Sequence, residues 1–157
     1  MIVGLGVVAG IEAFEENGRK ASMDNMTTMA TGYAGKMIEW KLKPSAQGGG
    51  QSANAFIGFD VNNLGLEGGK TLDFLGGSTS NWAEVSGLYV SVWEHAAVLG
   101  ATHVAVHDPK YDTQISIFVY GPDPQCFVHR TSYMQDGSRV DIPSMWPENP
   151  DTDLCTF

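Results

Sequence analysis

Basic residues are scarce in this chain, and their scarcity limits what it can bind. The 157 residues include 9 Lys and Arg against 18 Asp and Glu, which gives a net charge of −9 at pH 7. Nucleic acids and anionic lipids both need clustered cations, so neither is an expected partner. Charged residues make up only 17% of the chain, whereas 43% of the residues are hydrophobic. This composition predicts one folded domain whose surface is partly covered by another molecule.

Recognisable catalytic signatures are lacking as well. The chain has no G-x-S-x-G and no H-E-x-x-H sequence. The glycines at 48–50 follow a predicted helix, whereas a phosphate-binding loop precedes one. We therefore expect no enzyme activity and no cofactor.

Candidate metal ligands are few and poorly grouped. His103 and His107 lie four residues apart on a predicted strand and share a face, but only Asp108 offers a further ligand nearby, too few for zinc. We expect two solvated or partly packed imidazoles. Four aspartates near the C-terminus could form a weak calcium site, although a solvated acidic loop is the simpler interpretation. These aspartates are Asp136, Asp141, Asp151 and Asp153.

Only two cysteines are present, Cys126 and Cys155. In a reducing cytosol they would be buried free thiols, whereas in an exported protein they would pair and tie the tail to the body. For an exported chain we expect the disulfide.

The opening residues 1–11 lack any charge. As a helix this run would rise about 16 Å, well short of the roughly 20 apolar residues that a membrane span needs. It also lacks the basic region and cleavage site of a signal peptide. The run is therefore either a buried first element of the domain or the end of a longer apolar helix.

Proline is absent before Pro44, which favours one long helix. We predict a helix over residues 1–43, loosened at Asn17-Gly18, where a turn signal lies. Its apolar residues recur in steps of three and four, which is typical of one buried helical face. They are Met26, Met29, Ala30, Tyr33, Met37 and Trp40.

Beyond the helix the patterns favour strands. Residues 52–82 are predicted to be loop-rich with short extended pieces, and the residues after 134 to form a closing loop. The short connections between the strands leave no room for crossover helices, so an antiparallel meander in an α+β fold is expected. The predicted strands are Leu88–Trp93, Ala101–His107, Gln114–Tyr120 and an edge strand at Cys126–Tyr133.

Several stretches together resemble bacterial type IV pilins and pseudopilins. "MIVGLGVVAGIEAF" is similar to the second half of their apolar helix. "RKASMDNMTTMATGYAGKMIEWKLKPSAQGGG", followed by F-x-G-F-D at Phe56, Gly58, Phe59 and Asp60, is similar to a group of pilin-like proteins. The resemblance covers residues 1–66; beyond them it is architectural, including the C-terminal cysteine pair. One departure is Leu5, where pilins usually carry a glutamate. Either the true protein begins upstream of Met1, or assembly does without that glutamate, so the departure bears on the processing route more than on the fold.

The resemblance implies a structural subunit of an extracellular, cell-surface helical filament, with transient residence in the inner membrane before assembly. Copies of the chain would be its partners; a glycan or surface ligand is unknown. Residues 1–17 would serve polymerisation, 18–43 would pack on the sheet, and 44–157 would form a globular head. Gly6 and Gly10, four apart, would allow close helix packing. The expected interface residues are Met1, Ile2, Val3, Leu5, Gly6, Val7, Val8, Gly10, Ile11 and Phe14.

An alternative is a membrane-anchored surface module that binds carbohydrate or another solute. The helix would then be the remnant of an anchor, and Trp82, Trp93 and Trp146 would form an exposed binding platform.

Overall fold

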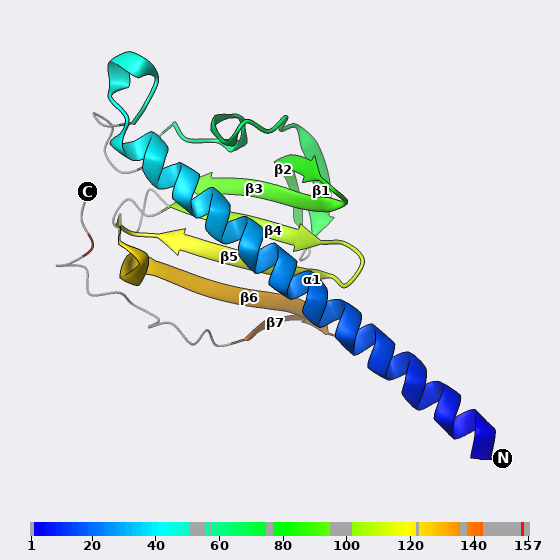
Figure 1. Ribbon diagram of the computed structural model, residues 1–157. Helices are drawn as coiled ribbons and strands as arrows, with labels where there is room; N and C mark the ends of the chain where they lie inside the picture. Colours follow the sequence, from blue (N-terminus) through cyan, green and yellow to red (C-terminus); the bar gives the residue numbers. More distant parts are fainter. Residues whose placement is uncertain are drawn as a thin grey trace.

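One long helix lies diagonally across one face of an antiparallel sheet (Figure 1). The computed structural model describes residues 2–50, 56, 58–74, 77–94, 102–121, 123–135, 138–142 and 155. The predicted α+β architecture, a long N-terminal helix on an antiparallel meander, is confirmed. Its helices are α1 (Ile2–Leu42) and the short 3-10 turns η1 (Ser45–Gln47), η2 (Val61–Leu64) and η3 (Pro124–Cys126). Its strands are β1 (Lys70–Phe74), β2 (Gly77–Val85), β3 (Leu88–Glu94), β4 (Thr102–Asp108), β5 (Thr113–Val119), β6 (Phe127–Gln135) and β7 (Ser138–Ile142).

Helix α1 runs without interruption through Asn17-Gly18, so the predicted loosening there is wrong. Gly18 serves packing, because a Cβ at this position would collide with the hydroxyl of Tyr111. The helix ends at Leu42, just before Lys43 and Pro44. Proline disfavours a helical conformation in the residue that precedes it, so Pro44 accounts for this end.

Within the described residues the strands follow one another across the sheet in chain order, β1 to β7, each antiparallel to the next. The three central predicted strands, β3 to β5, are confirmed to within one residue at each end. Strand β6 pairs with both β5 and β7, so its prediction as an edge strand is wrong. The β1–β2 hairpin begins in the segment predicted to be loop-rich with short extended pieces, and β2 is longer than such a piece. Strand β7 lies in the predicted closing loop, and that prediction is wrong there.

The main core lies between α1 and the sheet. Helix α1 contacts β4 and β5, and η2 lies beside its C-terminal half. The predicted buried face is confirmed at Met26, Ala30, Tyr33 and Met37. Met29 and Trp40 are partly buried against the same core. Strands β3 to β5 supply Leu88, Val90, Val92, Val104, Val106, Ile115, Ile117 and Val119.

The opposite face of the sheet is buried too. Every described side chain of β4 and nearly every one of β5 is buried, and this continuous burial is typical of strands covered on both faces. The second face carries Trp82, which is 0% exposed. A two-sided sheet of this kind fixes register strongly, because a one-residue slip would exchange the two faces.

The predicted Cys126–Cys155 disulfide is present, and it closes a 29-residue separation. Cys126 lies at the start of β6, with its Cα 5.5 Å from that of Cys155. Gly121 permits the approach, because a Cβ there would lie 3.1 Å from the Cα of Cys155. The bond therefore fastens the tail of the chain to the sheet.

Candidate assembly interface on the long helix

The N-terminal part of α1 extends past the edge of the sheet (Figure 1). Among the side chains described from Gly10 onward, none before Met26 is buried. Residues 2–17, which we call the free segment, would be about 24 Å long at 1.5 Å per residue. Most helical stability in proteins comes from packing of an amphipathic face. Of the side chains described in the free segment, from Gly10 onward, none is buried against the sheet.

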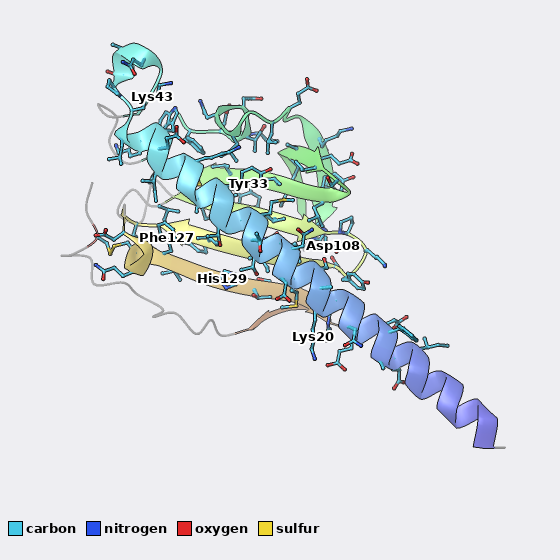
Figure 2. All side chains as sticks on the ribbon, viewed as in Figure 1. Lys20, Tyr33, Lys43, Asp108, Phe127 and His129 are labelled. Carbon is cyan, nitrogen blue, oxygen red and sulfur yellow. A yellow bond between two sulfur atoms is a disulfide. The ribbon has the colours of Figure 1, made fainter. Side chains whose placement is uncertain are left out.

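The last support for α1 before the free segment is the turn between β4 and β5. The hydroxyl of Ser22 donates a hydrogen bond to Oδ2 of Asp108, and Oδ1 of the same carboxylate accepts from the backbone N–H of Lys110 at 2.8 Å. Asp108 is 6% exposed, and Figure 2 shows it beside α1. The aspartate thus fixes both its own turn and the point where the helix leaves the sheet.

Loss of the Ser22 hydroxyl should weaken this anchor. Hydrogen bonds to charged groups contribute roughly 1.5–3 kcal/mol, so Ser22→Ala is expected to lower the free energy of unfolding by about 1–2 kcal/mol. Urea unfolding followed by circular dichroism measures the change. Thr28→Ala is the matched control, because its exposed hydroxyl donates only to the backbone oxygen of Asp24 within the helix. Equal effects of the two substitutions would contradict the anchor.

Two large apolar side chains of the free segment face solvent in the single chain. Phe14 is 81% exposed and Ile11 is 54% exposed. They are three residues apart and therefore lie on the same side of the helix. Full burial of one such side chain contributes about 1.5–3 kcal/mol, so a surface that covers both would gain appreciably.

The free segment is also acidic. Glu12, Glu15 and Glu16 are exposed, and only Glu16 has a described ion-pair partner, Lys20, whose Nζ lies 2.9 Å from Oε1. The hydrogen bond and charge of Lys20 lower the pKa of Glu16 below its usual value, with a smaller contribution from Arg19. The chain therefore presents carboxylates next to Phe14 and Ile11, with few cations to balance them.

Side chains are described for only some of the predicted interface residues. Gly10 is half-buried, and a Cβ there would meet nothing within 4 Å. Residues 2–9 are helical in backbone, but the side chains of Ile2, Val3, Leu5, Val7 and Val8 lie outside the described part of the chain, as does Met1. The role of these residues stays a prediction, whereas Ile11 and Phe14 are placed where a neighbour could reach them.

His103 and His107 share the second face of the sheet, as predicted, but they are buried at 5% and 4% exposure. They belong to a cluster of stacked and edge-to-face rings. Ring centroids lie 6.3 Å apart for Trp82 and His107, 5.4 Å for Trp93 and His103, and 4.6 Å for His103 and Phe118. Asp108, which was considered as a further metal ligand, instead accepts a hydrogen bond from Ser22 of α1. Among the described residues, no three His, Cys, Asp or Glu side chains are grouped to hold a metal ion.

The imidazoles of His107 and His129 should make the free energy of unfolding depend on pH. Burial lowers the pKa of His107, although Asp112, the Thr113 backbone and Asp108 act in the opposite direction, and burial also lowers that of His129. The unfolded chain then binds more protons between the folded pKa and the ordinary value of about 6.5, so stability rises with pH there.

We expect the free energy of unfolding to fall as the pH is lowered from 7.5 to 5, with a slope of at most about 1.4 kcal/mol per pH unit for each histidine. Urea titrations at several pH values measure the slope, and His107→Gln should reduce it. A stability that is flat or increases towards pH 5 would contradict the burial of neutral imidazoles.

The predicted tryptophan platform is not supported by the geometry. Trp82 is 0% exposed, which corrects its assignment as an exposed binding residue. Trp93 is partly buried and donates through Nε1 to the hydroxyl of Ser91 at 2.6 Å. Trp146 lies outside the described residues, as do Asp136, Asp151 and Asp153 of the weak calcium site, while Asp141 lies on β7.

Sequence reasoning missed the anchor of α1 altogether. Ser22 and Asp108 are 86 residues apart, and no local pattern relates them. The apolar residues Ile11 and Phe14, by contrast, can be found in the sequence, because Ile11 ends the uncharged run and Phe14 lies among Glu12, Glu15 and Glu16. In the part of the chain that the structure describes, no helix has an apolar stretch long enough to cross a bilayer.

The chain was compared with models of protein families, with curated proteins and with solved structures, and none of the three comparisons found a match.

Proposed function

We propose that this chain is the structural subunit of an extracellular helical filament of the type IV pilus kind, which assembles through the N-terminal part of α1. The observation that carries the proposal is the exposure of Phe14 and Ile11 on a helical segment that extends past its own sheet. Apolar groups in this position are stabilised when copies of the chain cover them.

Two further features support the proposal. The Cys126–Cys155 disulfide fits an oxidising compartment outside the cytoplasm. The long N-terminal helix on an antiparallel sheet is compatible with a pilin-like architecture, and the residues 1–66 that resemble pilins include all of α1. A membrane-anchored binding module is less well supported, because Trp82 is buried and cannot contribute to a platform.

Deletion of residues 1–11 tests the proposal. The shortened chain is expected to be a monomer that retains its sheet, because Met26 is the first buried residue among the described side chains of α1. Light scattering reports the association state and circular dichroism the sheet content. Loss of the sheet signal would show that the deleted run belongs to the core of the domain, and assembly of the shortened chain would show that the run is not the polymerisation element.

A further inference from the structure

The far end of α1 carries a surface pocket of about 310 Å³ between the helix and η2. Three residues of α1, the residue that follows the helix, two residues of η2 and the glycine after η2 line it: Lys36, Glu39, Trp40, Lys43, Asn63, Leu64 and Gly65. Leu64 is buried at 3% exposure, and Trp40 packs edge-to-face on Phe59 with ring centroids 5.0 Å apart. The pocket therefore combines an apolar base with exposed lysine ammonium groups.

We propose that this pocket receives the free segment of a second copy of the chain, with Phe14 against Trp40 and Leu64 and the acidic side chains beside Lys36 and Lys43. The inference deepens the proposed filament by naming the surface that receives the polymerisation helix, and it rests on that proposal. It commits to one occupant, the Ile11–Phe14 side of a neighbouring α1.

Charge complementarity favours this occupant. Lys36 and Lys43 are exposed, and Lys36 makes only a long hydrogen bond of 3.4 Å to the backbone oxygen of Leu64 and a contact with the Tyr33 ring at 5.4 Å. The free segment carries three glutamates within five residues. Glu39 also lines the pocket and offsets one of the two lysines, so the pocket keeps a net positive charge in a chain of net charge −9. A positive surface favours an acidic partner segment.

The geometry of α1 excludes the chain's own free segment. Phe14 and Trp40 lie on one continuous helix, so 26 residues at 1.5 Å separate them by roughly 39 Å. Figure 2 shows Lys43 at the end of α1 opposite to the projecting end. Contact therefore requires another copy, displaced by about this distance along the helix direction. This contact joins two different surfaces of the subunit, the free segment and the pocket. Because every subunit carries both surfaces, the contact can repeat from one copy to the next and build a filament.

Zero-length cross-linking of the intact assembly tests the contact without any substitution. Carbodiimide joins a carboxylate to an amine that it already touches, and peptide mass spectrometry identifies the pair. Glu16–Lys20, at 2.9 Å within one chain, is the internal positive control. We expect additional links from Glu12 or Glu15 to Lys36 or Lys43, which cannot form within one chain because the helix holds these residues about 30 Å or more apart.

The alternative outcomes overturn the inference in distinct ways. Links from Lys36 or Lys43 to Glu39 form within one chain, because these residues are three and four positions apart, and they are set aside. Links from the two lysines to carboxylates outside the free segment and other than Glu39 would assign the pocket to another occupant. Recovery of the Glu16–Lys20 control and the Glu39 links alone would show that the free segment lies elsewhere. Absence of any filament in the starting material would instead contradict the proposed function.

Charge reversal in cells provides the second test. Glu12→Lys/Glu15→Lys and Lys36→Glu/Lys43→Glu should each reduce filament number at least tenfold, and co-expression of the two variants should restore filaments, since each carries the complement of the other. Asp24→Lys is the matched control, an exposed charge reversal on α1 away from both surfaces, and should leave filaments normal. Normal filaments from either variant alone, or no restoration on co-expression, would overturn the pairing.

Discussion

Replacing Gly10 with aspartate is expected to abolish filaments while the head stays folded. In the single chain a side chain at this position would meet nothing within 4 Å, and aspartate has a slightly higher helix propensity than glycine, so the monomer tolerates the change. In the filament that we propose, Gly10 lies against a neighbouring helix. An unpaired buried carboxylate costs several kcal/mol, and every subunit would repeat that cost. Gly6→Glu is expected to act in the same way.

Electron microscopy of cells that carry the variant measures filament number, and circular dichroism of the purified chain reports its fold. Gly35→Asp is the matched control, because Gly35 is an exposed glycine of α1 that also has nothing within 4 Å of its Cβ position but lies outside the free segment. Normal filaments from Gly10→Asp would mean that this side of the helix faces solvent, and the polymerisation role of the free segment would have to be abandoned.

Replacing Trp82 with alanine is expected to produce the largest loss of stability, about 3–5 kcal/mol, from the missing burial and the cavity left behind. Trp82 is 0% exposed, and its ring centroid lies 6.2 Å from that of Trp93 and 6.3 Å from that of His107. Urea unfolding of the purified chain measures the change.

Phe14→Ala is the contrasting aromatic substitution, because Phe14 is 81% exposed. Surface substitutions away from special features usually change stability by no more than about 0.5 kcal/mol, so this variant should unfold like the parent chain. A small effect of Trp82→Ala, or binding of a carbohydrate that depends on Trp82, would restore the interpretation of this residue as part of an open platform.

The long helix could be predicted because its signals are strong and local. Charged and apolar residues alternate with helical spacing from Met26 onward, and the first proline stands directly after the end of the helix. The central strands β3 to β5 carry β-branched and aromatic residues, and their bounds were predicted almost to the residue.

The β1–β2 hairpin could not be predicted in the same way, because β2 opens with Gly-Ser-Thr-Ser-Asn, in which glycine and asparagine disfavour strands. Pairing with β3 overrides these local preferences. The sequence did offer a signal for the end of β2: Ser86-Gly87 is a two-residue turn between β2 and β3, and both residues have positive φ angles, 53° and 81°, as tight hairpins require.

Burial on the second face of the sheet was the main error. Trp82, His103 and His107 were expected to be exposed or only partly packed, yet all three are buried among ring contacts between neighbouring strands. A sequence pattern shows which side chains share a face, but it does not show whether something covers that face. The same limit applies to Asp108, whose bond to Ser22 depends entirely on where α1 crosses the sheet.

The central claim is tested most directly by microscopy of material sheared from the cell surface, with antibody labelling against the sheet-bearing head and mass spectrometry of the sheared fraction. Our account predicts filaments labelled along their whole length, with this chain as the main protein and with an intact Cys126–Cys155 disulfide. Recovery of the chain only as unassembled protein in the cell or membrane fraction, with no labelled filaments, would contradict it.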